Sequence, residues 1–276
     1  MTVCLHVSTI EPGPLRENYL ISRLAWHWER AGHRISYGAA SLAGADLGIL
    51  HVDRTRVFAK DLPGNPKGVP LLNGSVLDIS KNLYSTLRVL PGDSWDGPVI
   101  IKSVLNCFGG PEWRGAPRGL FARMRRKLAR RHWRLAQCLP PGDYPILSKL
   151  SEVPEWVWED PELIVERFLP EREGEFYCLR GWIFFGDRGY TYRLFSHAGV
   201  VKIKSMVKSE ILGEPPPELE AFRAAHGFDF GKFDYVLVDG RPVILDVNKT
   251  PILSAAPDTP RVKDLAEGLR SFLEQV

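Results

Sequence analysis

The sequence has few cysteines, and they are not arranged to hold a metal ion or to build a disulfide framework. Its 276 residues contain only Cys4, Cys107, Cys138 and Cys178, and no two of them form a Cys-x-x-Cys pair. Structural zinc sites and small disulfide scaffolds both need clustered cysteines, so the spacing argues against both. Scattered thiols are typical of proteins that work in the reducing cytoplasm, where we expect this chain to act.

Long apolar runs are absent as well. No stretch approaches the roughly 18 consecutive apolar residues of a membrane span, and the N-terminus has no basic segment followed by an apolar one. We therefore expect neither a membrane span nor a signal peptide. Hydrophobic residues make up 44% of the chain, charged residues make up 25%, and the formal net charge is +3. These values are ordinary for a globular protein, so function must be inferred from local patterns.

Two common nucleotide-binding fingerprints are missing. No Gly-x-Gly-x-x-Gly follows the first expected strand, Val3–Val7, and no Gly-Lys-Ser/Thr opens a helix. The N-terminal part instead shows a β-α-β rhythm, with a helix over Asn18–Ala31 followed by strands over Arg34–Tyr37 and Asp46–Val52. This rhythm predicts a small open sheet covered by helices, which we expect to form one wall of a substrate cleft.

The most informative stretch lies near the C-terminus. Tyr235–Val238 and Val243–Val247 are two runs rich in β-branched residues, and an Asp-Gly turn between them predicts a hairpin. Asp246 and Asn248 are two residues apart and so point to one face of a strand, while Asp234 lies just before the first strand and is brought opposite them. Two carboxylates and an amide suit Mg²⁺ shared with nucleotide phosphates. The hairpin alone leaves open that these residues only end a strand on a solvated face.

Cationic residues within apolar strands suggest anion binding. Lys102 leaves a predicted strand over Gly97–Ser103, shortly before the pair Gly109-Gly110, whose backbone N–H groups could close over phosphate. An edge-strand lysine followed by a turn is the alternative. Arg180 and Arg193 lie in two strands of a predicted antiparallel meander, and each needs an anion, either a protein carboxylate or a ligand phosphate.

A strongly basic segment runs from Arg114 to Arg134 and holds nine Arg/Lys residues and no acid. Leu120, Met124 and Leu128 give it one apolar face, so it is predicted to be an amphipathic helix. Such a helix could attract RNA or an acidic carrier. The alternative is a solvated helix whose apolar face packs on the core.

In this order the segments resemble the ATP-grasp family, over most of the chain from about Lys81 to Pro251. The most specific match is Phe228-Asp-Phe-Gly-Lys-Phe-Asp-Tyr-Val, then Asp-Gly, then Ile-Leu-Asp-Val-Asn-Lys-Thr-Pro. It is similar to the family's metal-binding segment, an acid followed about a dozen residues later by acid-x-Asn. The resemblance implies that Asp234, Asp246 and Asn248 hold Mg²⁺ or Mn²⁺. Many members have Glu where Asp246 stands, so this carboxylate reaches less far.

The resemblance also implies a fold and a set of nucleotide contacts. The fold is α+β: an N-terminal open α/β lobe over residues 1–80, then two α+β subdomains over 81–165 and 166–276 that clasp ATP. Phosphates would be held by Lys81 and Lys102 under a mobile loop with Gly109 and Gly110. Adenine would be read by a hinge of Glu166, Arg167, Phe168 and Leu169, and the ribose by Glu175. Arg180, Arg193 and Lys204, with Lys102, would face phosphate or a reactive intermediate.

The activity that the resemblance implies is ATP-dependent joining of a carboxylate to an amine or a thiol through an acyl phosphate. The substrates would be small molecules such as amino acids or peptides. Two alternatives stay open, namely a kinase on the same fold and a nucleotide-binding protein without turnover. The sequence does not name the acid or the nucleophile, and an oligomer is neither predicted nor excluded.

Overall fold

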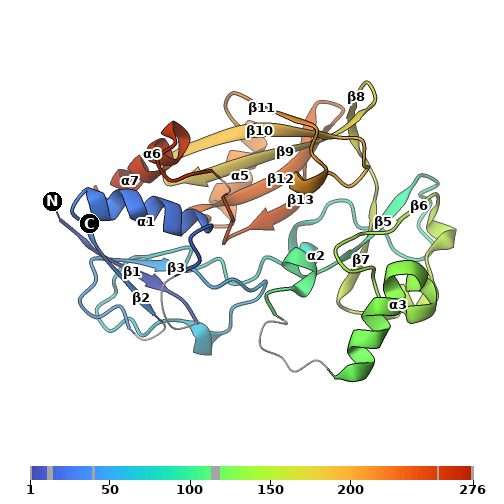
Figure 1. Cartoon of the computed structure of the whole chain (residues 1–276), viewed down its shortest axis with the longest axis horizontal. Coiled ribbons are helices and arrows are strands. Elements are labelled where there is room, and N and C mark those ends of the chain that lie inside the picture. The colour runs from blue at the N-terminus through green and yellow to red at the C-terminus, as the bar shows by residue number, and fades with distance from the viewer. Residues whose placement is uncertain (1, 11–14, 39–40, 113–118, 254, 275–276) are drawn as a thin grey trace.

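The computed structural model describes residues 2–10, 15–38, 41–112, 119–253 and 255–274. Within these ranges three β-sheets are arranged along the molecule, and Figure 1 shows helices packed between the first and the largest of them. The N-terminal sheet is parallel and has the order β2-β1-β3-β4, from β1 (Cys4–Ser8), β2 (Arg34–Gly38), β3 (Leu47–Leu50) and β4 (Leu71–Leu72). This is the small open sheet that the β-α-β rhythm predicts.

A second, three-stranded sheet follows. Its strands are antiparallel in the order β6-β5-β7, from β5 (Val99–Ser103), β6 (Ile146–Leu147) and β7 (Leu163–Arg167). The helices of this region are α2 (Lys81–Tyr84), α3 (Leu120–Ala136) and α4 (Glu155–Glu159), and the short 3-10 turns before and within it are η1 (Ala59–Asp61), η2 (Asn106–Gly109) and η3 (Leu150–Glu152).

The largest sheet is six-stranded and antiparallel, in the order β11-β10-β9-β12-β13 with β8 pairing to β9. Its strands are β8 (Glu171–Glu173), β9 (Phe176–Phe185), β10 (Arg188–Ser196), β11 (Lys208–Ile211), β12 (Phe230–Val238) and β13 (Arg241–Asn248). The other elements of this half are η4 (Ile203–Ser205), α5 (Pro217–Ala225), α6 (Pro260–Glu267) and α7 (Arg270–Leu273). The hairpin β12–β13 confirms the prediction from the Asp-Gly turn, because Asp239 and Gly240 occupy it with positive φ.

The hydrophobic core of the N-terminal sheet extends into the C-terminal half. Helix α1 (Leu20–Arg30) buries Leu20, Leu24 and Trp28, and α6 and strand β9 pack into the same cluster. The indole Nε1 of Trp28 donates a hydrogen bond to the carbonyl of Ala266 at 2.8 Å. Figure 1 shows α1 and α6 lying between the two sheets. The division at residues 80 and 165 stays a proposal, since the first sheet shares this core with the last helices.

Several expected elements differ from the observed ones. The run Val200-Val-Lys-Ile-Lys204 predicts a strand from its alternating residues, but none forms there. Lys202 instead donates to the carbonyl of Gly142 at 2.6 Å, residues 203–205 make a 3-10 turn, and the edge strand is β11. The sequence also predicts a helix that opens at Asp78 with this residue as its N-cap. The structure differs, because α2 starts at Lys81 and Asp78 accepts from the N–H of Ser80 at 2.7 Å. Asp234 lies inside β12 rather than before it.

The basic helix begins later than expected, at Leu120, and ends at Ala136. Arg114 and Arg118 of the predicted helix lie outside the described residues. Within the part of the chain that the structure describes, no helix combines the length and the apolar character needed to cross a membrane.

Candidate functional site

A cavity of about 160 Å³ lies between the three-stranded sheet and the large sheet. One part of its wall is apolar and comes from both sheets and the loops beside them, including Leu87, Ile100, Phe168, Leu169, Val200, Val236 and Leu245. The other part is charged and includes Lys81, Lys102, Glu166, Asp234 and Asp246. The cavity therefore has an apolar side suited to a flat ring and a charged side suited to anions and cations.

Lys102, which lies on β5, links β7 and β13 on the charged side of the cavity. Its Nζ lies 2.6 Å from Oε2 of Glu166 on β7, an ion pair rather than an aligned hydrogen bond, and donates to the carbonyl of Leu245 at 3.3 Å. That carbonyl is available because Tyr235 pairs with Ile244 and Asp234 with Asp246, which leaves Leu245 as a bulge in β13. Both charged side chains are almost fully buried, so each needs the other unless a ligand replaces it.

Lys81, the first residue of α2, forms the second ion pair, with a carboxylate on β13 at the edge of the large sheet. Its Nζ lies 2.8 Å from Oδ1 of Asp246, and the hydroxyl of Tyr84 donates to the same oxygen at 3.1 Å. Burial by itself raises the pKa of Asp246, but the lysines, Lys81 foremost, outweigh burial and hold it below its usual value. Burial, helped by Asp246, raises the pKa of Tyr84 well above its ordinary value, so its phenol stays a donor.

Asp234 stands directly opposite Asp246 in the β12–β13 register. Its Oδ2 lies 2.8 Å from Nζ of Lys232, and its Oδ1 is buried with no hydrogen-bond partner among the described residues. Burial raises the pKa of Asp234, Lys232 opposes this, and the charge of Asp246 adds to it. An orphaned buried oxygen beside a second carboxylate is a place where a cation would relieve both desolvation and repulsion.

Asn248 completes the predicted metal set only in part. It pairs with Lys232 in the register, and its Oδ1 accepts from the N–H of Thr250 at 2.8 Å. The hydroxyl of Thr250 also lies 3.4 Å from this oxygen, but its one proton can go instead to Oδ1 of Asp53 at 3.0 Å. In that arrangement one lone pair of the amide oxygen is left for a further partner. The described residues contain no group of three or more His, Cys, Asp or Glu arranged for a metal ion. The oxygens of Asp234 and Asp246, with the amide of Asn248, are nevertheless the donor type that Mg²⁺ prefers.

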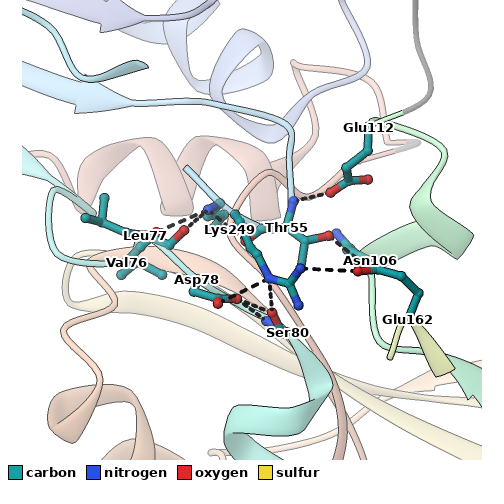
Figure 2. Close-up of polar contacts among 10 residues, drawn as sticks. Thr55, Val76, Leu77, Asp78, Ser80, Asn106, Glu112, Glu162 and Lys249 are labelled. Atoms are coloured by element: carbon teal, nitrogen blue, oxygen red, sulfur yellow. Dashed lines mark hydrogen bonds and ion pairs between the residues drawn. The ribbon is translucent and has the colours of Figure 1, made fainter. Parts of the chain in front are cut away.

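The residue after Asn248 anchors the end of β13. Lys249 is buried, and its Nζ donates to the carbonyls of Val76 at 3.2 Å and of Leu77 and Thr55 at 3.4 Å each (Figure 2). Burial lowers the pKa of Lys249 to about 8. The end of β13 that carries Asn248 is thus fixed to segments much earlier in the chain.

Thr55 joins three parts of the molecule through three different atoms (Figure 2). Its N–H donates to Oε1 of Glu112 at 2.6 Å, its Oγ1 accepts from the N–H of Asn106 at 2.8 Å, and its carbonyl accepts from Lys249. Asn106 and Glu112 flank the predicted glycine loop. The predicted glycine loop and the end of β13 are therefore tied to the same residue.

The glycine loop itself has an unusual backbone. Cys107, Phe108 and Gly109 have φ values of 47°, 58° and 67°, in the left-handed region that favours glycine. The ring of Phe108 stacks on Tyr144 with centroids 4.1 Å apart. Neither Gly109 nor Gly110 lines the cavity in this arrangement. Two non-glycine residues in this region store strain, which a movement of the loop would release.

The structure does not bring every predicted residue to the cavity. Arg180 lies with its Nη2 2.8 Å from Glu171, and Arg193 has Nη2 within 2.7 Å of both Glu173 and Glu210, so protein carboxylates supply their anions. Neither arginine lines the cavity. Two other predicted contacts are also remote from it, because Glu175 is an exposed turn residue beside His197 and Lys204 is exposed in a 3-10 turn.

The predicted hinge does line the cavity, through Glu166, Arg167, Phe168 and Leu169. The N–H groups of Arg167 and Phe168 already donate to the carbonyls of Leu87 and Pro98, at 2.8 and 2.9 Å. Among the hydrogen bonds within the described ranges, the N–H of Leu169 has no partner. This leaves Leu169 as the hinge donor that could read the edge of a ring.

Sequence reasoning missed Lys232, Tyr84 and Tyr144. Lys232 could have been found, since it stands two residues before Asp234 on one strand and must share its face. No local signal predicts Tyr84 or Tyr144, because both act through contacts with residues far away in the chain.

Comparison with known proteins identifies the fold of this chain. Neither a protein-family model nor a curated protein sequence matches the chain. Among solved structures, the chain resembles the ATP-grasp ligase PsnB complexed with a minimal precursor, with a TM-score of 0.55 and 11% identity over 98% of each chain. It also resembles the macrocyclase MdnC from Microcystis aeruginosa MRC bound with the precursor peptide MdnA, with a TM-score of 0.52 and 10% identity over 96% of this chain and 98% of that one. The three sheets, the cavity between two of them and these likenesses confirm the expectation from the sequence: this chain has the ATP-grasp fold.

Proposed function

We propose that the chain is an ATP-dependent ligase that joins a carboxylate to an amine, or to a thiol, through an acyl phosphate. One observation carries the proposal: Asp234 and Asp246 face each other at the charged side of a cavity where Lys81 and Lys102 converge. In the ATP-grasp fold this is a place for a triphosphate and a metal ion. The four free cysteine thiols support the cytoplasm as its place of action.

The two sides of the cavity determine how the nucleotide would be oriented. Adenine would lie on the apolar side against Phe168 and Leu169, with the free N–H of Leu169 as its donor. The enclosed volume of about 160 Å³ is below the roughly 300–1,000 Å³ of typical cofactor sites. The two sheets would therefore separate on binding, and Lys81 and Lys102 would exchange their carboxylate partners for phosphate oxygens.

Asp234, Asp246 and Asn248 would hold the metal ion. Mg²⁺, or Mn²⁺ in its place, supplies a positive charge that neutralises the transferring phosphate oxygens. The ammonium of Lys232 lies 2.8 Å from Oδ2 and favours the ionised form of Asp234, while burial raises the pKa of this carboxyl and a bound cation would lower it again. The orphaned Oδ1 of Asp234 is the oxygen that this chain leaves open for it.

With ATP and the two substrates positioned in this way, the proposed ligation has two steps. An oxygen of the substrate carboxylate attacks the γ-phosphorus of ATP, the bond to the bridging oxygen breaks, and ADP leaves. The amine attacks the acyl carbon, inorganic phosphate leaves, and the nitrogen loses a proton to form the amide. Lys102 and Lys232 would stabilise the negative charge, while the loop with Gly109 and Gly110 would exclude water from the acyl phosphate. Arg180 would assist only after releasing Glu171, and Arg193 only after releasing Glu173 and Glu210.

The test is turnover with defined products. Purified chain is incubated with ATP, Mg²⁺ and pooled amino acids, and ADP, phosphate and new masses are measured. We expect ADP and phosphate in equal amounts together with an amide product. A stable phosphorylated product without free phosphate would identify a kinase instead.

Two variants tie turnover to the site. Asp246→Ala and Asn248→Ala should keep the fold and abolish ADP formation, while Asp258→Ala, which removes an exposed carboxylate, should leave it unchanged. Turnover near the wild-type rate in either site variant would refute the assignment.

A further inference from the structure

Helix α3 presents an uncovered apolar face. Of its seventeen residues only Ala129 and Ala136 are buried. Five large apolar side chains of this helix are exposed, with Phe121 and Leu135 at 86% and 80%, and the others are Leu120, Met124 and Leu128. Figure 1 shows α3 at one corner of the molecule, beyond the three-stranded sheet. Leu120, Met124 and Leu128 recur every four residues before the break in helical geometry at His132, so they share one face, and exposed apolar side chains grouped in this way mark an interaction site.

The same helix carries positive charge that the protein does not balance. It has seven Arg/Lys residues and no acid. Arg125 and Arg134 donate to the backbone carbonyls of Ala136 and Glu152, at 2.7 and 3.0 Å. The side chains of the remaining five make no hydrogen bond or ion pair within the described part of the chain; they are Arg123, Arg126, Lys127, Arg130 and Arg131.

A groove runs between α3 and the body of the protein. It has a volume of about 630 Å³, with Phe121 and Arg126 on the helix side and Leu139, Trp156 and Leu163 on the other. The indole Nε1 of Trp156 has no hydrogen-bond partner among the described residues. Two carboxylates, Asp160 and Glu162, also line the groove; Glu162 lies 3.4 Å from Arg56, and Oδ1 of Asp160 accepts from the N–H of Glu162 at 2.9 Å. The groove therefore offers apolar walls and a free donor, and the excess of positive charge lies on its α3 rim.

A second hollow lies next to this groove. It has a volume of about 380 Å³ and is lined by Arg123, Arg126, Lys127, Arg130 and Pro141. Arg126 borders both hollows, so the cationic surface is continuous with the apolar groove. A partner that fills both must combine large apolar side chains with carboxylates.

We propose that this groove binds an acidic peptide segment that carries large apolar side chains. The charge pattern argues against a second copy of the chain, since two such helices would place like charges against each other. A flat membrane would meet only the outer face and leave the groove unused. An extended peptide can place apolar side chains in the groove and carboxylates on the rim at once.

The groove is also connected to the proposed site. Its floor includes Ser103, the residue after Lys102, and Phe108, the residue before Gly109. A bound peptide would contact the back of the strand and loop that handle phosphate. The inference deepens the proposed function by naming the chemistry of a partner, but binding at α3 does not require turnover.

The experiment uses the full chain without nucleotide, so its outcome is independent of whether the chain consumes ATP. Two pools of random 12-residue peptides are passed over the immobilised protein, one built from Asp, Glu, Leu, Phe, Ser and Gly, and one with Lys and Arg in place of the acids. We expect retention of the acidic pool to be at least about tenfold greater at low salt, and to decline as salt screens the rim charges. Equal retention of both pools would overturn the proposal.

Variants place the binding on α3. Arg126→Glu with Arg130→Glu, and separately Phe121→Ser with Met124→Ser, should each lower retention about tenfold or more. Lys263→Glu with Arg270→Glu makes the same change of charge at exposed positions of α6 and α7 and should have a much smaller effect. An equal loss in this control would overturn the proposal.

Other polyanions serve as competing outcomes. Anionic phosphatidylglycerol vesicles and a single-stranded RNA oligonucleotide are tested on the same variants. Binding of vesicles or RNA that depends on α3, without retention of the acidic peptide pool, would replace the peptide with that partner and refute the proposal.

Discussion

The cations around the cavity and the cations of α3 have opposite environments. Lys81, Lys102 and Lys232 are each within 2.8 Å of a carboxylate. On α3, five cationic side chains have no partner within the described ranges. A buried ammonium must be paired, whereas an exposed one can remain hydrated. A ligand that enters the cavity must therefore replace existing ion pairs, whereas a ligand at α3 meets cationic side chains that have no partner within the described ranges.

Removing one member of a buried pair should give the largest effect. Lys102→Met leaves Glu166 buried without a counter-charge, and we expect the free energy of unfolding to fall by about 3–5 kcal/mol in urea denaturation. Adding Glu166→Leu to that variant should restore most of the loss, because no charge then remains buried. A single variant within about 1 kcal/mol of wild type would show that the cavity pairs resemble surface pairs after all.

The next prediction concerns His51, a buried titratable side chain that forms no ion pair within the described residues. Both ring nitrogens are buried without a hydrogen-bond partner among the described residues, and burial lowers the pKa of His51 to about 4. The unfolded chain, with a pKa near 6.5, binds more protons between these values, so stability is lost as pH falls from about 6.5 toward 4. At pH 5 we expect a loss of about 2 kcal/mol relative to neutral pH.

His51→Phe should remove this dependence while keeping the edge contact with the ring of Tyr19. The readout is the urea midpoint at pH 5 and at pH 7.5, with His226→Gln at an exposed position as the control. A wild-type midpoint that is the same at both pH values would contradict the prediction.

Thr55→Val tests the contacts of Thr55, which are hydrogen bonds and not ion pairs. It removes the acceptor for the N–H of Asn106, and leaving that buried donor unpaired should cost about 1–3 kcal/mol in the free energy of unfolding. Thr259→Val loses a hydroxyl contact at an exposed position and should cost less than about 0.5 kcal/mol. If the two variants were equally stable, Thr55 would not be the junction described above.

The smallest effect is expected at α3. Arg130→Ser and Leu135→Gln remove a cation and an apolar side chain that the folded chain does not use, so each should change the free energy of unfolding by less than about 0.5 kcal/mol. The thermal midpoint of each variant checks this. A loss comparable to that of Lys102→Met would mean that α3 contributes to the fold and that the contrast between the two regions is false.

Much of the fold could be predicted because its signals are local. The period of Leu20, Leu24 and Trp28 gave α1, and the Asp-Gly turn gave the β12–β13 hairpin that aligns Asp234 with Asp246. The strand expected over 200–204 failed because its alternation of apolar and cationic residues is also satisfied by a turn whose Lys202 bonds to Gly142.

The candidate site was predictable where the signal is a strand register or a motif. The hairpin register placed Asp246 opposite Asp234, Lys102 stood out as a cation in an apolar strand, and the family resemblance supplied Lys81 and the hinge; all of them line the cavity. Arg180 has the same local pattern as Lys102, an isolated cation in an apolar strand, yet its anion is Glu171. Which anion neutralises a cation depends on residues brought close by the fold. Tyr84 and Thr55 act entirely through such distant contacts, so the sequence carried no sign of them.

The core that α1 shares with α6 has a consequence for how the chain is made. Trp28 is synthesised early, but its hydrogen-bond acceptor, Ala266, follows 238 residues later. Until α6 leaves the ribosome, the apolar side of α1 is covered only in part, by the N-terminal sheet, and their shared core is incomplete. Contacts of such sequence separation are formed slowly and expose apolar surface meanwhile. We expect the nascent N-terminal region to depend on chaperone protection, and the completed chain to fold as a single cooperative unit.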